Sequence, residues 1–316
     1  MKWWYTTRRW NNAMEQAQKD FMQVMLDGAP ERKQEIKTLW DTYNPKVIFE
    51  NNGALTLNAT SERIKIDFKM VDVFWLIGFS GWRAIETYFP NVIYAVLSNQ
   101  RVAVILQQDT DLDEMERNYK ERIAAVHTFI ESRDVNTAPW PPDIPRPSSN
   151  RDALNDPQYQ AAFDLTMSAV AFTLFHEFYH VMLDRDNRRP VARAEEELAC
   201  DVWAREFLTA KISAYAVSTE LNYTNKVLKR RSLSFVLAAL ILHEITPIWE
   251  QGGNQYYPSM AVRMRAIFDN TLLPPSCDFW YFASAVLIGI CRQKQIPFDP
   301  PAMSARELTD FLLKLI

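Results

Sequence analysis

The sequence predicts an α+β protein that is predominantly helical, with a small mixed N-terminal region and an all-helical C-terminal half. Only 7 glycines occur among 316 residues, and 48% of the residues are hydrophobic, which is typical of an ordered globular chain. Helical periodicity recurs along most of the sequence, whereas short strand-like runs are expected only between residues 47 and 106. We therefore expect a small sheet attached to a large helical body.

The first third of the chain mixes helices and strands. Helical periodicity covers residues 10–26 and 32–43. Strand-like runs follow at residues 47–50, 55–58 and 63–68. Asn51-Asn52-Gly53 predicts a hairpin between the first two runs, because Asn-Gly tolerates the positive φ angles of a tight turn. The region is expected to end with a buried helix over residues 70–88, a strand over 102–106 and a helix over 112–131.

A proline-rich segment separates this region from the rest. Residues 135–150 contain five prolines and can form neither a helix nor an interior strand. They form either a connector in the polyproline conformation or a strap that lines a cleft. Beyond them, helices are expected at residues 158–183, 191–210, 225–251, 259–270, 278–291 and 304–315. The expected organisation is a mixed region (1–134), a Pro-rich connector (135–152) and a helical region (153–316), with one continuous domain as the alternative.

Composition excludes several classes of protein. The net charge is −4 with both signs interspersed, so the chain lacks the clustered basic face that nucleic acid requires. The basic runs at residues 188–189 and 229–231 are expected to be solvated helix ends. Three scattered cysteines and an N-terminus without the apolar core of a signal peptide predict a cytoplasmic, disulfide-free protein. The apolar segments are shorter than the roughly 20 residues of a spanning helix, so no stable membrane insertion is expected.

The strongest functional signal is the run His176-Glu177-Phe178-Tyr179-His180. HExxH on a helix places two imidazoles one turn apart on the same face, and Glu177 beside them. Two histidines and a carboxylate at the end of an apolar helix would be costly unless an ion satisfied them. Zn²⁺ would do so, with Glu177 taking a proton from a metal-bound water. The alternative is a pair of core histidines bonded to backbone groups.

A third ligand is expected from the next helix. Glu197 and Asp201 are i,i+4 partners and face the same way. Glu197 can therefore bind the metal while Asp201 accepts the second ring N–H of a ligating histidine. Glu195 and Glu196 are expected to belong to a solvated face.

Further candidates are less specific. The oxyanion of the reaction needs a donor, and His243 is the best candidate by residue type, although a lone histidine on an apolar helix is more often a satisfied core residue. Tyr179, Tyr256 and Tyr257 are weaker candidates. Arg263 is expected to clamp a carboxylate near the ligand helix. His127 is expected to be structural, and Cys200 a small buried hydrophobe.

These motifs resemble known families. HExxH followed by Glu-x-x-x-Asp is the gluzincin arrangement, and residues 197–208 are similar to the ligand helix of ImmA/IrrE-type and CAAX-prenyl-endopeptidase-type metallopeptidases. Residues 257–264 resemble their His-Pro-x-x-x-x-Arg-Ile element, with Tyr257 in place of the histidine. The Trp-Pro-Pro-x-x-Pro stretch before a helical half resembles the phage-exclusion Lit peptidase family. The resemblance implies a soluble prokaryotic zinc endopeptidase, and a role in phage exclusion and antiviral defence.

Two classes of function follow. The first is a cytoplasmic zinc endopeptidase that cuts one or a few proteins in defence or regulation, under the control of a trigger or regulator protein. The second is a binding or regulatory protein that retains a zinc-peptidase fold and acts through its N-terminal surface. Zinc can be held without a general base, so the intact Glu177 favours the enzyme. Peptide substrates often pair with an edge strand, and only the strands expected between residues 47 and 106 could supply one. The sequence does not indicate the oligomeric state.

Overall fold

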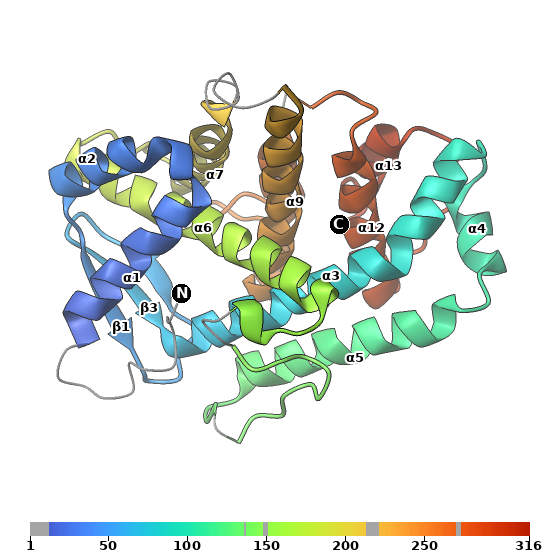
Figure 1. The fold of residues 1–316 in the computed structure, drawn as a ribbon, viewed down its shortest axis with the longest axis horizontal. Coiled ribbons are helices and arrows are strands. Elements are labelled where there is room, and N and C mark those ends of the chain that lie inside the picture. Colours follow the sequence, from blue (N-terminus) through green and yellow to red (C-terminus); the bar gives the residue numbers. More distant parts are fainter. Residues whose placement is uncertain (1–12, 136, 148–150, 213–220, 270–272) are drawn as a thin grey trace.

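The computed structural model describes residues 13–135, 137–147, 151–212, 221–269 and 273–316 (Figure 1). As predicted, the protein is predominantly helical, with one small sheet. The sheet and helices α1 (Ala13–Gly28) and α2 (Lys33–Tyr43) lie at one end of the molecule. Helices α4 (Val102–Gln108), α12 (Asp278–Gln293) and α13 (Ala305–Leu312) lie toward the other.

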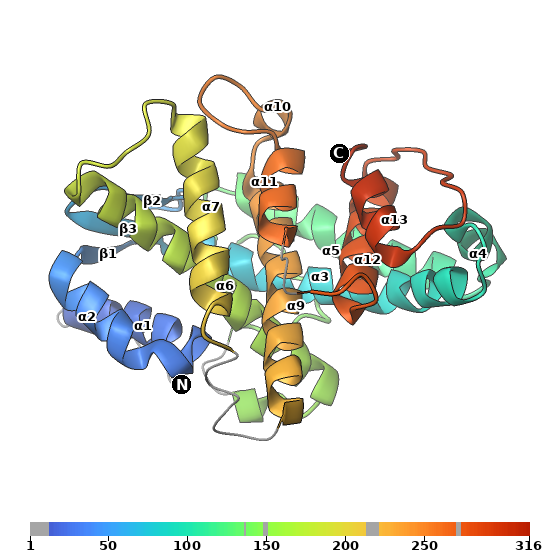
Figure 2. The same ribbon diagram turned by 90° about the horizontal axis from the view of Figure 1, so that it is seen from above.

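Three helices pass through the centre. Figure 1 shows α3 (Phe68–Leu97) running from the sheet toward α4, with α6 (Pro157–Arg185) beside it. Helix α9 (Leu221–Ile245) packs against both α3 and α6. Helix α5 (Leu112–Glu131) has the predicted bounds and packs along α3, and α7 (Arg193–Thr209) packs on α6 (Figure 2). These contacts place α6 and its HExxH motif inside the fold.

The sheet differs from the predicted hairpin. Its strands β1 (Lys46–Glu50), β3 (Arg63–Asp67) and β2 (Leu57–Ala59) lie in that order, so β1 and β2 do not pair. Strand β1 runs parallel to β3, and β2 runs antiparallel to it. Gly53 has a φ of 71°, as an Asn-Gly turn requires. The turn instead binds the start of α3: the Asn52 N–H donates to Asp67 Oδ2 at 2.9 Å, which directs the chain away from β1.

The predicted strand at residues 102–106 is wrong, because this segment is helix α4. Val102, Ile105 and Leu106 are its buried residues, and their i, i+3, i+4 spacing is helical. Periodicity cannot separate a strand from a helix in so short an apolar run. The predicted helix at residues 225–251 is also interrupted. Pro247 lacks a backbone N–H and separates α9 from the short α10 (Ile248–Gln251).

The proline-rich segment packs against helices rather than along a cleft. The indole Nε1 of Trp75 donates to the carbonyl of Pro145 at 2.7 Å, and Arg122 pairs with Asp143 at 2.8 Å. The Tyr159 hydroxyl donates to the carbonyl of Asp143 at 2.9 Å. Residues 137–147 are thereby fixed to α3, α5 and α6, and none of them lines the cleft described below.

Two further expectations concern charge and cysteine. Arg231 is not solvated: its side chain is buried, and its Nη1 donates to the carbonyl of Leu208 at 2.7 Å and pairs with Glu31. All three cysteines are free and buried, in agreement with the expectation that they form no disulfide framework. Within the described part of the chain, none of the helices combines the length and hydropathy that crossing a membrane requires.

Candidate metal centre

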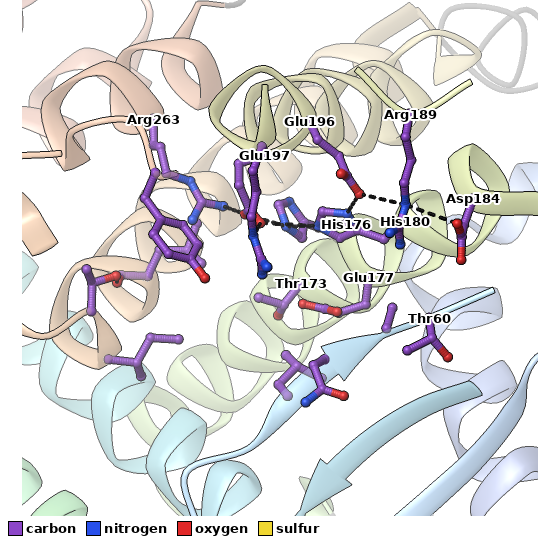
Figure 3. A pocket seen from close by; sticks show the side chains of 18 of the residues that line it. Thr60, Thr173, His176, Glu177, His180, Asp184, Arg189, Glu196, Glu197 and Arg263 are labelled. Atoms are coloured by element: carbon purple, nitrogen blue, oxygen red, sulfur yellow. Dashed lines mark hydrogen bonds and ion pairs between the residues drawn. The ribbon is translucent and has the colours of Figure 1, made fainter. Parts of the chain in front are cut away.

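Helices α6 and α7 bring the predicted ligands together. His176 and His180 lie on the buried face of α6, with exposed fractions of 4% and 9%. Glu197 and Asp201 are buried on the facing side of α7. Figure 3 shows Glu196, Glu197 and Arg263 approaching the two histidines from one side, while Glu177 lies on the other side, toward Thr60.

Three electron-pair donors converge at one point. The Nε2 atoms of His176 and His180 are 3.1 Å apart. Glu197 lies 3.4 Å from the first through Oε2 and 3.6 Å from the second through Oε1. Zinc binds such atoms at about 2.0–2.2 Å, so tetrahedral ligand atoms lie roughly 3.3 Å from one another. The spacing of these three side chains therefore fits one small cation.

The other ring nitrogens explain why a cation is needed. Nδ1 of His180 forms a hydrogen bond of 2.6 Å with Glu196 Oε1, whereas Nδ1 of His176 lies 2.9 Å from Asp201 Oδ1 in an ion-pair contact without hydrogen-bond alignment. A carboxylate accepts hydrogen bonds, so it favours the tautomer with the proton on Nδ1. In neutral rings both Nε2 lone pairs would then face each other and the Glu197 carboxylate. Such a group is stable only with a proton or a metal ion among its atoms.

Arg263 holds the carboxylates in place. Its Nε donates to Asp201 Oδ2 at 2.7 Å and its Nη2 to Asp201 Oδ1 at 2.9 Å, while Nη2 lies 3.4 Å from Glu197. Burial would raise the pKa of Asp201, but Arg263 and His176 hold it below its ordinary value. Burial likewise opposes ionisation of Glu197, and His176 and Arg263 outweigh it, so the pKa of Glu197 is well below its usual range. Both groups are therefore carboxylates in the folded protein.

Glu196 corrects an expectation. We expected a solvated side chain, but Glu196 is buried and contacts His180, whereas Glu195 is exposed as expected. Glu196 continues the buried stripe of Cys200, Ala204 and Phe207 by one turn toward the N-terminus of α7. Extending that stripe backward would have found it from the sequence.

Replacing Glu196 with Gln should weaken zinc binding by roughly 10–100-fold, the usual effect of losing a partner that orients a ligating histidine. Glu195→Gln is the matched control, because this neighbouring carboxylate is exposed and should leave the affinity unchanged. Competition with a chromogenic chelator measures both affinities. Equal affinities in the two variants would show that Glu196 does not orient His180.

Cys200 is an alternative third donor. Ligand atoms of His176, His180 and Cys200 all lie within 4.8 Å of one another, so this buried group could also hold a metal. Burial raises the pKa of the Cys200 thiol strongly, and the carboxylates of Glu197 and Asp201 raise it further. A protonated thiol is a poor ligand, whereas Glu197 is ionised and lies 3.4 Å and 3.6 Å from the two Nε2 atoms. We therefore favour Glu197.

Glu177 lies in the wall of the adjoining cleft. Burial raises its pKa above the ordinary value, although His180 and His176 oppose the shift. A carboxylate with a raised pKa is a better proton acceptor at neutral pH than an exposed one. Its location and pKa suit a general base.

The cleft has a volume of about 620 Å³ and runs between helices α6 and α7 and strand β2. The N–H of Asp67 donates to Thr56 O at 2.9 Å, and the N–H of Thr60 donates to Arg63 O at 2.8 Å. Antiparallel pairs alternate, so the backbone groups of Leu57 and Ala59 between them point away from β3. Both residues line the cleft, and β2 is an edge strand among the described residues. The cleft therefore offers backbone donors and acceptors to an extended ligand.

His243 is not brought to the cleft. The cleft face of α9 carries Leu242, Ile245 and Thr246, and His243 lies off that face. Its ring is buried, with Nδ1 2.9 Å from Glu244 Oε1, and Glu244 Oε2 lies 2.7 Å from Nε2 of His127. The structure therefore does not place His243 in the cleft, and its role as an oxyanion donor stays a prediction.

The tyrosine candidates are also separated. Tyr257 lines the cleft, whereas Tyr179 is stacked on Trp203 with ring centroids 4.6 Å apart. Tyr256 is 56% exposed and is absent from the cleft lining. Of the three, Tyr257 alone is placed to meet a ligand in the cleft.

Zinc binding should release a proton at neutral pH. Burial lowers the pKa of His176, but Asp201 and Glu197 outweigh it and raise the pKa to about 10 in the metal-free chain. The stabilisation of the folded, metal-free protein by that proton is complete below the ordinary histidine pKa of 6.5 and is lost as the pH rises through about 10. Zinc must displace the proton, so its apparent affinity should rise by up to about tenfold per pH unit between those values. Calorimetric titration in buffers of different ionisation enthalpy measures the release; a pH-independent affinity would contradict it.

Comparison with known proteins gives one match. A sequence profile of the family described as Peptidase U49 matches residues 64–283, more than half of the chain. The matched region includes β3, the HExxH helix, α7 and Arg263. No curated protein and no solved structure matches the chain.

Proposed function

The chain belongs to the Peptidase U49 family, and on this premise we propose that it is a zinc-dependent endopeptidase of the gluzincin type. Family membership supports peptidase activity, and the donor atoms of His176, His180 and Glu197 support the metal. The observation that carries the proposal is the convergence of these three donors beside Glu177 at the wall of an open cleft.

In the proposed mechanism, zinc held by His176, His180 and Glu197 would polarise the scissile carbonyl and lower the pKa of the attacking water. Glu177 accepts the proton of that water and later delivers it to the leaving amine, so that one carboxylate serves as base and then as acid. Asp201 and Glu196 keep the two imidazoles in the tautomer that presents Nε2, and Arg263 fixes Asp201.

The substrate is proposed to bind as an extended segment along β2. Leu57 and Ala59 would supply the outward backbone groups, which adds a strand to the sheet edge. An extended segment presents its peptide bonds at a spacing of about 3.3 Å per residue, so one bond can lie beside Glu177 while its neighbours pair with β2. This arrangement suits a loop or terminus of a protein.

We propose that the enzyme is selective or latent. A general peptidase in the cytoplasm, where we expect this chain to act, would degrade its own cell. Selectivity would come from the cleft, from an N-terminal docking surface or from a trigger protein. The purified enzyme should therefore leave unstructured casein largely intact.

The test compares wild type with Glu177→Gln in cells. Expression of the wild type should yield a few discrete cleavage products that vanish in the variant, because the substitution removes proton transfer and retains docking. Rapid digestion of casein at many sites would contradict selectivity. Products that never depend on Glu177 under any trigger would favour the binding-protein alternative. A role in phage exclusion, proposed from the family resemblance, is tested by infecting cells that express either form.

A further inference from the structure

Arg193 is the least tightly paired arginine among the described residues that line the cleft. Its nearest recorded carboxylate oxygen, Glu197 Oε1, lies 4.0 Å from its Nε, at the limit of an ion pair. Its side chain is 58% exposed, and its guanidinium lies over the ring of Tyr257 at 5.0 Å from the centroid. The Tyr257 ring attracts the guanidinium of Arg193, and both residues line the cleft that a ligand would enter.

The other arginines of the cleft wall have closer partners. Arg263 is bound by Asp201 at 2.7 Å. Arg189 lies 3.3 Å from Asp184 and 3.4 Å from Glu196. Of these three arginines, Arg193 therefore has the N–H groups that are most available to a ligand.

Arg193 contributes little to its surroundings. It is the first residue of α7, where a positive charge opposes the helix dipole by about 0.3–1 kcal/mol. Its one carboxylate neighbour, Glu197, is shared with His176, His180 and Arg263. Neither helix stability nor ion pairing accounts for an arginine at this position.

We propose that Arg193 forms a subsite for a carboxylate side chain of the substrate, so that the enzyme cuts beside an Asp or Glu. The inference rests on the proposed endopeptidase function and adds the substrate chemistry to it. Arg193 Nε lies 4.0 Å and His180 Nε2 lies 3.6 Å from the same oxygen, Glu197 Oε1, so the guanidinium is close to the candidate metal ligands. Extended residues advance about 3.3 Å each, so the recognised side chain lies within about two residues of the cleaved bond. The planar guanidinium can bind a carboxylate through two parallel hydrogen bonds.

The experiment maps Glu177-dependent cleavage sites in extracts of cells that express the full chain, and then purifies the protein that is cut. We expect an Asp or Glu within about two residues of each site. Exchanging that acid for Lys in the substrate should lower kcat/KM by about tenfold or more, mainly through KM. Arg193→Glu should lose the original substrate to a similar extent and recover activity on the Lys variant. Both enzymes should retain the same zinc content.

Arg188→Glu is the matched control. Arg188 lies in the connection that precedes α7, is 56% exposed, pairs with Asp186 and does not line the cleft, so its reversal should leave the cleavage sites unchanged. Sites without a nearby acid, or equal products from Arg193→Glu and wild type, would overturn the subsite and leave the peptidase intact. The absence of any Glu177-dependent product would instead refute the proposed function, and the subsite with it.

Discussion

Glu177→Gln should reduce the rate of peptide hydrolysis by about 10²–10⁴-fold while the protein keeps its zinc. Glutamine has nearly the same shape as glutamate but accepts no proton at neutral pH, so the substitution removes the general base alone. The donor atoms that converge belong to His176, His180 and Glu197, and not to Glu177, so the metal should stay bound. Rates on the mapped protein substrate, with metal content from the same preparations, measure both effects.

Glu195→Gln is the control for this prediction, because Glu195 is an exposed carboxylate at the start of α7 and should retain full activity. An active Glu177→Gln enzyme would show that another group takes the proton. Loss of zinc from this variant would show instead that Glu177 is a ligand.

His176→Ala and His180→Ala should each remove most of the zinc. Four-ligand structural sites bind with about 10–16 kcal/mol, so one ligand is worth roughly 3 kcal/mol, or about 10²-fold in affinity. Each alanine also leaves a buried carboxylate, Asp201 or Glu196, without its imidazole partner. Metal analysis after dialysis against a chelator measures the loss.

His127→Ala is the matched control, since His127 pairs with Glu244 away from the cleft and should retain zinc. Glu197→Gln and Cys200→Ser separate the two candidates for the third ligand. We expect strong zinc loss from the first and little from the second. The reverse result would assign the thiol as ligand and the carboxylate as a neighbour of the site.

Much of this site could be predicted because its signals are local. The i,i+4 spacing of His176 and His180 fixes their common face, and the same spacing links Glu197 to Asp201. The helical body followed from periodicity, and the bounds of α5 were predicted to the residue. Such features depend on neighbours in sequence.

Other features depend on tertiary contacts. The burial of Glu196 follows from the way α7 packs on α6, and the position of His243 follows from which face of α9 meets the cleft. The strand order β1-β3-β2 accompanies a hydrogen bond from the Asn52 N–H to Asp67, a contact that no pairing rule predicts. Val102, Ile105 and Leu106 formed a run too short for periodicity to assign.

The zinc content of the purified wild-type chain tests the central claim most directly. The converging donor atoms of His176, His180 and Glu197 fit one small cation, and the account assigns that place to zinc. After supplementation with zinc and removal of the excess, metal analysis should find about one zinc per chain. Wild-type protein that holds no metal under these conditions would contradict the account.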